Sequence, residues 1–167
     1  MNQVFLALGS NIRPEYYLPQ AVRLLSKHGV ILRKSSVWQS KPVGDHAQAD
    51  FLNAAVLLET DLDASRICFE IIAKIEQTLD RIRDPDNKNG PRTIDIDLVL
   101  FNVEQLQIEH RIIPDPEIVS RDFLAVPLAE LAPQYCVPGL QRELSQIAHD
   151  LSSLKGSQLM RRDDVLL

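Results

Sequence analysis

The chain has 167 residues, is 45% hydrophobic and carries a formal net charge of −5 at pH 7. This apolar content is enough for one sizeable core, and the length is usual for a single domain. The negative charge excludes a general attraction to nucleic acid or to anionic membranes, so any affinity for phosphate must be local. No apolar run is long enough to span a membrane, and no signal peptide is evident, so we expect a cytoplasmic protein. Cys68 and Cys136 follow no metal-ligand spacing, which fits a reducing compartment.

Apolar strands alternate with two segments of helical spacing in the first part of the chain. We predict strands over Val4–Leu8, Val30–Trp38, Phe51–Glu59 and Thr93–Phe101, and helices over Glu15–Lys27 and from Asp63 to Leu79. Asp63 is a predicted helix cap, because its side chain can accept a backbone hydrogen bond. The order strand, helix, strand, strand, helix, strand is that of a split βαβ arrangement. We therefore predict an α+β protein with a ferredoxin-like core, in which helices pack on a mainly antiparallel sheet.

Smaller elements are predicted after this core. They are a hairpin around Glu104–Ile113, short helices near Val119 and Leu128, and a final helix over Leu140–Leu154. We assign residues 1–154 to a single domain and residues 155–167 to a C-terminal tail of unknown role. The sequence Arg161-Arg162-Asp163-Asp164 within it is typical of a solvated tail.

Two carboxylates stand two residues apart at the start of the fourth predicted strand. Side chains alternate along a strand, so Asp95 and Asp97 should lie on one face, about 6.6 Å apart along the chain. Oxygen ligands of this kind suit Mg²⁺, which often takes one or two carboxylates and completes its shell with substrate phosphates and water. The alternative is that both aspartates are solvated residues at a strand edge.

The remainder of that strand argues against simple solvation. Its apolar side chains are expected to be buried on both faces, with Ile94, Ile96, Leu98 and Leu100 opposite the carboxylates and Val99 and Phe101 on the carboxylate face. A carboxylate that enters a buried strand needs a partner, because its desolvation is costly. Arg92 is expected on the other face of the strand, so a metal ion is the simpler partner.

Basic residues surround the two carboxylates in the sequence. Arginine pairs with phosphate oxygens through two hydrogen bonds and stays protonated, so it suits a triphosphate. The candidates are Arg81, Arg83, Lys88, Arg92, Arg111 and Arg121. For Arg81 and Arg83 an alternative exists, because cations at the end of a helix interact favourably with the helix dipole without any ligand.

Three loops are expected to surround the start of the fourth strand. They are Gly9–Asn11, Ser40–Asp50 and Asp84–Gly90. In the first loop Gly9 would allow a close backbone approach, although an ordinary turn before a helix also explains it. The second loop is long and mostly polar, which suits a mobile binding loop, and the third could close over a nucleotide.

Phe51 and Asn53 share a face of the third predicted strand. A fused bicyclic heterocycle needs both side chains, because the phenyl ring offers a stacking surface and the amide can match a ring amino group beside a carbonyl. The alternative is that Phe51 belongs to the core and Asn53 is a polar residue at the strand end.

The string Gly90-Pro91-Arg92-Thr93 followed by Ile94-Asp95-Ile96-Asp97 resembles the signature of the 6-hydroxymethyl-7,8-dihydropterin pyrophosphokinase family of folate biosynthesis. Further matches follow in the same order over residues 4–148. They are Leu8-Gly9-Ser10-Asn11, Pro42-Val43-Gly44, the stretch from Gln48 to Ala54, Ile113-Pro114, Arg121-Asp122-Phe123 and the stretch from Val126 to Glu130. The resemblance implies a ferredoxin-like, monomeric enzyme with small-molecule substrates. It would transfer pyrophosphate from ATP to the hydroxymethyl group of the dihydropterin, leaving AMP.

The resemblance also implies residue roles. The pterin would lie between Phe51 and Phe123, with Asn53 contacting the ring and Asp95 near the hydroxyl as a candidate general base. Backbone groups near Ser40, Pro42 and Val43 would complete that pocket. Asp95 and Asp97 would hold two Mg²⁺ ions, and Arg81 and Arg92 would assist transfer electrostatically. The residues assigned to ATP are Glu76, Arg83, Lys88, Arg92, Leu98, Arg111, Ile112, Asp115 and Arg121.

Four positions depart from the family pattern, and all concern ATP. Asp115 stands where a histidine is usual, Asn89 where many members have tryptophan, and Ala73 where a polar residue is expected. Arg111 lies one residue later than the expected arginine. Asp115 would either face the triphosphate and oppose it, or cap the short helix that starts near Glu117.

Two other hypotheses follow from these departures. One is a catalytically weak or silent pterin- or nucleotide-binding paralogue on the same fold, and the other is a regulatory or assembly domain that uses only the sheet and helices. Intact Arg92, Asp95 and Asp97 favour the enzyme over both.

Overall fold

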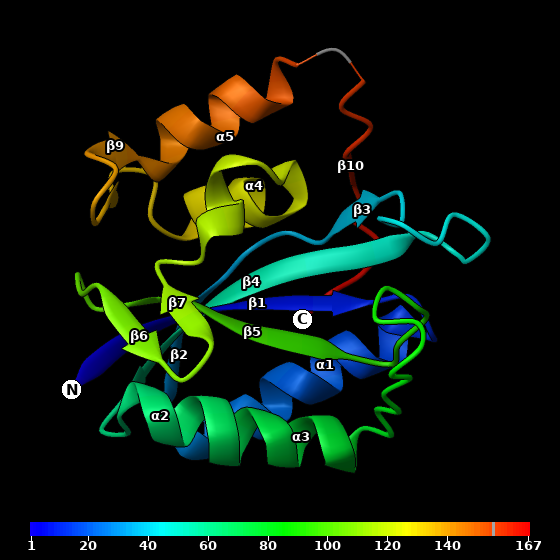
Figure 1. The fold of residues 1–167 in the computed structure, drawn as a ribbon, viewed down its shortest axis with the longest axis horizontal. Coiled ribbons are helices and arrows are strands. Elements are labelled where there is room, and N and C mark those ends of the chain that lie inside the picture. The colour runs from blue at the N-terminus through cyan, green and yellow to red at the C-terminus, as the bar shows by residue number, and fades with distance from the viewer. Residues whose placement is uncertain (155) are drawn as a thin grey trace.

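One antiparallel sheet separates two layers of helices (Figure 1). This computed structural model describes residues 1–154 and 156–167. The strand order across the sheet is β10 (Met160–Arg161), β3 (Trp38–Ser40), β4 (Phe51–Thr60), β1 (Asn2–Ser10) and β5 (Asp95–Phe101), and β2 (Val30–Lys34) also pairs with β4. Because β4 lies between β1 and the strands that follow the first helix, the predicted split βαβ order and ferredoxin-like core are confirmed.

The helices cover both faces of the sheet (Figure 1). One face carries α1 (Pro14–Leu25) and the continuous run of α2 (Ala64–Arg66), a π-helical stretch (Ile67–Ile72) and α3 (Ala73–Thr78). The other face carries α4 (Asp122–Leu131) and α5 (Leu144–Ser152). The predicted cap is present, since the Asp63 side chain accepts a hydrogen bond from the backbone N–H of Arg66. Within the described residues, no helix combines the length and the apolar character needed to cross a membrane.

Short elements complete the chain. They are the 3₁₀ turns Ser26–His28 and Pro116–Val119, the hairpin of β6 (Leu106–Ile108) and β7 (Arg111–Ile113), and the hairpin of β8 (Cys136–Val137) and β9 (Arg142–Glu143). The final helix starts at Leu144 and not at Leu140, because a reciprocal pair of capping hydrogen bonds between Glu143 and Gln146 begins it there.

A hydrophobic core lies on each face of the sheet, which explains why the central strands are apolar along almost their whole length. In β1, Val4 and Leu6 point into the core under α1 and α3, while Phe5 points into the core under α4 and α5. Each of these side chains is almost fully buried. Burial of a side chain of this size contributes about 1.5 to 3 kcal/mol, so β1 is held firmly from both sides.

Two predicted strands differ from the observed ones. The strand expected over Val30–Trp38 is divided into β2 and β3, because the Ser35 hydroxyl replaces a backbone acceptor for the N–H of Ala55. The strand expected from Thr93 starts at Asp95. A register shift opposite Phe5 and Leu6 then changes the alternation along β5. As a result Leu98 and Phe101 share one core, and Val99 and Leu100 share the other, which corrects the predicted faces of Phe101 and Leu100.

The C-terminal segment, residues 156–167, is not the solvated tail that its charges suggested. Strand β10 pairs with β3, and the N–H of Arg162 donates to the carbonyl of Val37 at 2.8 Å. Val165 is only 6% exposed and belongs to the core under α1. Lys34 Nζ donates to a Leu167 main-chain oxygen at 2.6 Å. Strand pairing by β10, hydrogen bonds at Arg162 and Leu167, and the burial of Val165 thus tie this segment to the sheet. Lys155 lies outside the described residues.

Candidate active site

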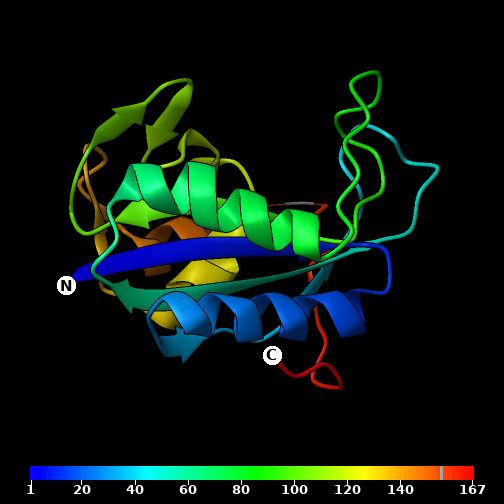
Figure 2. The same cartoon turned by 90° about the horizontal axis from the view of Figure 1, so that it is seen from below.

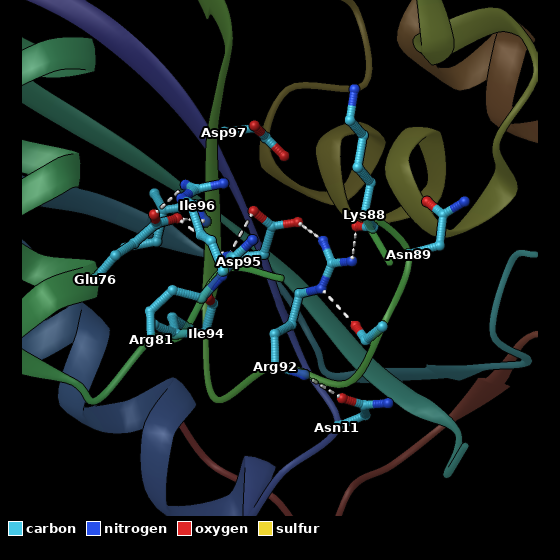
Figure 3. Close-up of polar contacts among 12 residues, drawn as sticks. Asn11, Glu76, Arg81, Lys88, Asn89, Arg92, Ile94, Asp95, Ile96 and Asp97 are labelled. Atoms are coloured by element: carbon cyan, nitrogen blue, oxygen red, sulfur yellow. Dashed lines mark hydrogen bonds and ion pairs between the residues drawn. The ribbon is translucent and has the colours of Figure 1, made fainter. Parts of the chain in front are cut away.

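Strand β5 carries the two carboxylates at its first and third residues. Asp95 is held by two arginines, since its Oδ1 accepts from Arg81 Nη1 at 3.0 Å and its Oδ2 accepts from Arg92 Nη1 at 2.8 Å (Figure 3). The expectation that Arg92 lies on the opposite face was therefore wrong. Arg92 precedes the strand, so the side-chain alternation does not apply to it. Burial alone would raise the pKa of Asp95, but the charges of Arg81 and Arg92 outweigh it and hold that pKa below its ordinary value.

Asp97 has weaker compensation. Its Oδ1 lies 3.4 Å from Arg111 Nη1, and its side chain is 44% exposed. Burial among protein atoms, together with the carboxylate of Asp95, raises the pKa of Asp97 to about 7 in spite of Arg111. The surroundings of Asp97 are thus short of positive charge, which is the electrostatic condition for binding a cation.

A buried ion network lies behind the carboxylates. Glu76 is 3% exposed, and its Oε1 accepts from the backbone N–H of Ile96 at 2.9 Å. Its two oxygens also pair with Arg81 at 3.5 Å and Arg83 at 2.6 Å. Arg81 donates further to the Ile94 carbonyl at 2.5 Å. Glu76 and Arg81 therefore connect α3 to the start of β5 and orient Asp95 (Figure 3).

The amide of Asn53 has a defined orientation. Its Nδ2 donates to the Trp38 carbonyl at 3.1 Å and to Ser40 Oγ at 2.8 Å. A carbonyl can only accept, so the amide nitrogen must face Trp38. Both donor hydrogens are then used by the protein, and Oδ1 is left for a ligand. This corrects the expectation that Asn53 offers both a donor and an acceptor.

Gly9 separates Asn53 from Asp95 across the sheet. It is the register partner of Asn53 on one side and of Asp95 on the other. Neighbouring strands are about 4.8 Å apart, so the Asn53 and Asp95 backbones are separated by about 10 Å. A Cβ at position 9 would lie 3.7 Å from Asn53 Oδ1 and 3.9 Å from the Phe51 ring, which are ordinary contacts. The prediction that Gly9 allows a close backbone approach is therefore not supported. The missing side chain instead keeps the floor between Asn53 and Asp95 open.

Two phenyl rings and one guanidinium group line the same cleft. Phe51 enters it from β4 and Phe123 from the first turn of α4. The guanidinium carbon of Arg92 lies 5.7 Å from the centroid of the Phe51 ring, within the range of a cation–π contact. Arg92 therefore touches both the aromatic pocket and the carboxylate of Asp95.

The three predicted loops meet at one end of the sheet. The segments 41–50 and 84–90 project side by side (Figure 2), where Asn87 Nδ2 donates to Asp45 Oδ2 at 3.1 Å and Gln48 Nε2 donates to the Asn89 carbonyl at 2.5 Å. Asn11, from the first loop, donates to Gln48 Oε1 at 2.8 Å and accepts from the N–H of Arg92 at 2.8 Å. Asn11 thus links all three loops.

The cleft brings together most of the predicted site residues. They are Ser40, Val43, Phe51, Asn53, Arg92, Asp95, Asp97, Asp115, Arg121 and Phe123. Arg81 and Arg111 contact the carboxylates without lining the cleft. Other predicted residues lie apart: Pro42 and Leu98 are buried, Arg83 and Ile112 are exposed elsewhere, and the Lys88 side chain points away from Arg92 (Figure 3).

Sequence reasoning missed several residues that line the cleft, among them Lys41, Glu117 and Leu124. Lys41 could have been inferred from its position beside Ser40. Nothing in the sequence pattern marks Glu117 or Leu124, because they reach the cleft through the path of the chain after β7.

Asp115 caps the 3₁₀ turn Pro116–Val119, since its Oδ1 accepts from the N–H of Glu117 at 2.8 Å. The predicted cap is confirmed. The same carboxylate also lines the cleft, and its charge contributes to the raised pKa of Asp97. Asp115 therefore acts on the cleft as well as on the turn.

Among the described residues, no three His, Cys, Asp or Glu side chains are grouped so that the protein alone could hold a metal ion. Two carboxylates that need substrate oxygens to complete a coordination shell are the usual arrangement for Mg²⁺ with a nucleotide. Paired carboxylates and arginines beside an aromatic pocket define a transferase that handles phosphate groups.

The chain belongs to the 7,8-dihydro-6-hydroxymethylpterin-pyrophosphokinase (HPPK) family, whose family model matches residues 5–133. It is 42% identical over 136 residues to 2-amino-4-hydroxy-6-hydroxymethyldihydropteridine pyrophosphokinase of Bacillus subtilis, a match that covers 80% of each chain. The protein of that name from Methylorubrum extorquens is 36% identical over 142 residues, covering 83% of this chain and 88% of the relative. The predicted family and the predicted enzyme class, a pyrophosphokinase, are confirmed.

Solved structures show the same fold. An HPPK-DHPS structure of Plasmodium falciparum superposes with a TM-score of 0.69 at 16% identity, covering 92% of this chain and 44% of that chain. A second one, with pteroate, gives a TM-score of 0.71 at 13% identity, covering 91% of this chain and 42% of that chain. This chain therefore spans less than half the length of those solved chains.

Proposed function

We propose that this cleft carries out the reaction of the family, in which pyrophosphate passes from ATP to the hydroxymethyl oxygen of 6-hydroxymethyl-7,8-dihydropterin and AMP leaves. The observation that carries the proposal is the row Asn53, Gly9 and Asp95 across three adjacent strands. In this row the free amide oxygen of Asn53 and the Asp95 carboxylate lie on either side of an open floor, which supports their assignment as the acceptor for a ring N–H and as the catalytic carboxylate. A flat heterocycle that lies over Gly9 would direct its substituent towards Asp95.

The pterin half of the cleft binds the ring by stacking and by one directed hydrogen bond. Phe51 and Phe123 supply the apolar faces, and Asn53 Oδ1 accepts from a ring amino or N–H group. Ser40 and Val43 border the ring, while Pro42 supports the loop from a buried position. A ring without a donor towards Asn53 would leave its oxygen unpaired, so this amide contributes specificity.

Asp95 and Asp97 are the residues that would hold Mg²⁺, and the shortage of positive charge around Asp97, which raises its pKa, supports this assignment. Each oxygen of Asp95 has a second lone pair beyond its arginine contact, so the carboxylate can still coordinate. When bound, two Mg²⁺ ions would neutralise phosphate charge and align the attacking and leaving oxygens. The arginines keep Asp95 ionised, so its carboxylate can contact the hydroxyl proton, but its lowered pKa makes it a weak base.

The arginines act on the phosphates. Arg92 and Arg121 line the cleft, and we assign them to phosphate oxygens, where they would stabilise the charge that develops during transfer. Arg92 would exchange its hydrogen bonds to Asp95 and to the carbonyls of Gly90 and Lys88 for these contacts. Arg81 contributes its charge from behind Asp95, where its side chain is 7% exposed. Arg111 would exchange its long contact with Asp97 for a phosphate oxygen.

The remaining nucleotide contacts are assigned by family resemblance and location. Arg83 and Ile112 are exposed outside the cleft and would contact a part of the nucleotide that extends beyond it, and Lys88 lies on the loop beside Arg92. Glu76 and Leu98 are buried, so we propose that they shape the nucleotide side by supporting β5. We also propose that the enzyme works as a monomer in the cytoplasm.

Calorimetry followed by a turnover assay tests this function. A nonhydrolysable ATP analogue is titrated with and without Mg²⁺, and 6-hydroxymethyl-7,8-dihydropterin is added afterwards; AMP release is then measured with ATP itself. We expect nucleotide binding that depends on Mg²⁺ and pterin-dependent AMP release. Binding of both ligands without AMP release would identify a silent paralogue, and absence of all binding would identify a regulatory or assembly domain.

A further inference from the structure

The C-terminal segment, residues 156–167, lies beyond the family match at residues 5–133 and reaches the pterin half of the cleft through a chain of hydrogen bonds. We propose that Arg162 is a positioning residue for the pterin-binding loop 41–50, acting through Gln39 and Asp50. The proposal rests on the proposed function, because it takes this half of the cleft to be the pterin site. Arg162 would lower the KM for pterin without taking part in the chemistry.

The guanidinium of Arg162 is held in one orientation. Its Nε and Nη2 each donate to a carboxylate oxygen of Asp164 at 2.8 Å, which is a bidentate contact. The remaining Nη1 donates to Gln39 Oε1 at 3.0 Å. The Arg162 side chain is 28% exposed, in contrast to its neighbour Arg161. Arg162 thus presents one free donor to β3.

Gln39 transmits this contact to the base of the loop. Because its Oε1 accepts from Arg162, its Nε2 is turned towards Asp50, and donates to Asp50 Oδ2 at 2.8 Å. Lys41 Nζ donates to the same oxygen at 3.1 Å. Lys41 and Asp50 are the first and last residues of the loop, so the Asp50 carboxylate closes its base. The hydrogen bond from Gln39, followed by that from Lys41, also lowers the pKa of Asp50, which keeps it charged.

The closed base determines where pterin-binding groups lie. Lys41 and Val43 line the cleft, and Asp50 directly precedes Phe51, whose ring faces the substrate. On β3, Trp38 and Ser40 accept the two hydrogen bonds that orient the Asn53 amide. β3 has only three residues, and without β10 it would be an open sheet edge. Arg162 therefore acts on both the loop and the strand that orient the ring.

Arg161 provides a matched control on the same segment. Among the described residues its side chain pairs with Asp163, at 2.6 Å on the exposed surface, and donates no hydrogen bond to Gln39. Replacing either arginine by alanine removes the same charge and the same side-chain volume. Only Arg162→Ala removes the contact with the loop base.

The experiment measures kcat, Tm and the steady-state KM values for pterin and for ATP. The proteins compared are the full chain, the single variants Arg162→Ala, Arg161→Ala, Gln39→Ala and Asn53→Ala, and the double variant Arg162→Ala/Gln39→Ala. For Arg162→Ala we expect a KM for pterin raised roughly threefold to tenfold, the range of one ordinary lost hydrogen bond, with kcat and the KM for ATP unchanged. Arg161→Ala should match the unmodified chain. The double variant should be no worse than Gln39→Ala, because residues that act through one another are not additive.

The results distinguish a failure of the positioning role of Arg162 from a failure of the proposed pterin site. If Asn53→Ala raises the KM for pterin and Arg162→Ala does not, the positioning role is wrong and the pterin site stands. Additive effects of Arg162 and Gln39, or equal rises in both KM values with a lower Tm, would show a merely structural role and overturn the inference. If Asn53→Ala leaves pterin unaffected, the proposed site fails and the inference falls with it.

Discussion

The two halves of the cleft prepare for their ligands in different ways. On the side proposed for the pterin, Asn53 has its donors satisfied by the protein and presents one free oxygen, so this side is arranged before a ring arrives. On the nucleotide side, Asp95 and Arg92 are paired with each other, and Arg111 lies near Asp97. The difference teaches that an uncharged ligand can meet a rigid site, whereas a highly charged one must replace internal ion pairs that keep the empty site neutral.

The largest effect should come from removing one charge on the nucleotide side. Asp97→Asn should lower the transfer rate about a thousandfold or more, since several kcal/mol of transition-state stabilisation depend on its carboxylate. AMP release at saturating ATP, Mg²⁺ and pterin measures this. Asp61→Asn, at a highly exposed position away from the cleft, is the control. Near-normal turnover with unchanged Mg²⁺ dependence would refute the metal assignment.

The same variant should also change how the stability of the folded chain depends on pH. The pKa of Asp97 in the folded chain, about 7, lies above its ordinary value of 3.8, so the unfolded chain ionises first and the folded state loses stability as pH rises from about 4 to 7. Asp97→Asn removes this ionisation. Its Tm at pH 7.5 without metal should therefore equal or exceed that of the unmodified chain, and a lower Tm would contradict the unfavourable charge.

The second effect concerns the network behind the carboxylates. Glu76→Ala leaves the buried Arg81 guanidinium short of a partner and the Ile96 N–H without an acceptor, so the free energy of unfolding should fall by about 3 to 5 kcal/mol. Arg83→Ala removes an exposed partner of the same glutamate and should cost less than about 1 kcal/mol. Urea denaturation measures both. Equal losses would show that burial does not distinguish the two ion pairs.

The third prediction concerns only the half of the cleft that is proposed to bind the pterin. Asn53→Ala should weaken pterin binding by roughly 1 to 3 kcal/mol, because ring polar groups lose their partner, while ATP affinity stays unchanged. Calorimetric titration of each ligand checks this. A parallel loss of affinity for both ligands would indicate a general folding defect and no separation between the halves.

The smallest effect is expected at Asp115, whose carboxylate both caps the 3₁₀ turn Pro116–Val119 and places a negative charge in the cleft. Asp115→Asn keeps a good capping side chain and removes the charge, so ATP should bind more tightly by up to about 1 kcal/mol, with unchanged Tm. Asp115→His loses the cap and should lower the Tm by about 2 to 4 °C. Dissociation constants and melting curves decide between them. A normal Tm for Asp115→His would refute the stabilising cap.

Most of the fold could be predicted from the sequence, because periodicity reports burial directly. The strands at Val4–Leu8 and Phe51–Glu59 and the helix after Asp63 follow from it. The division between β2 and β3 could not be predicted, since it depends on a hydrogen bond from Ala55 to the Ser35 side chain across the sheet. The change of alternation in β5 likewise depends on its register with β1.

The candidate site was predictable where a residue type alone suggests chemistry. Asp95, Asp97 and Phe51 lie in the cleft as the motif suggested. Partners were not predictable, because contacts such as Arg81 to Asp95 join a loop after a helix to a strand 14 residues later. The C-terminal segment was misjudged for a related reason: a run of charges is typical of solvent exposure, but here one arginine meets a partner more than a hundred residues away.

Because Asn53, Gly9 and Asp95 lie in one row across three strands, the sheet fixes the distance across the cleft. Asn53 is proposed to contact the ring and Asp95 to face the reacting oxygen, and their backbones are two strand spacings, about 10 Å, apart. Hydrogen bonding fixes that spacing in every sheet. Side-chain substitution can change the affinity at either end of this distance but cannot lengthen it. An alcohol carried on an arm one carbon longer would bind its ring normally and hold its oxygen beyond the phosphorus, so it should act as an inhibitor rather than a substrate.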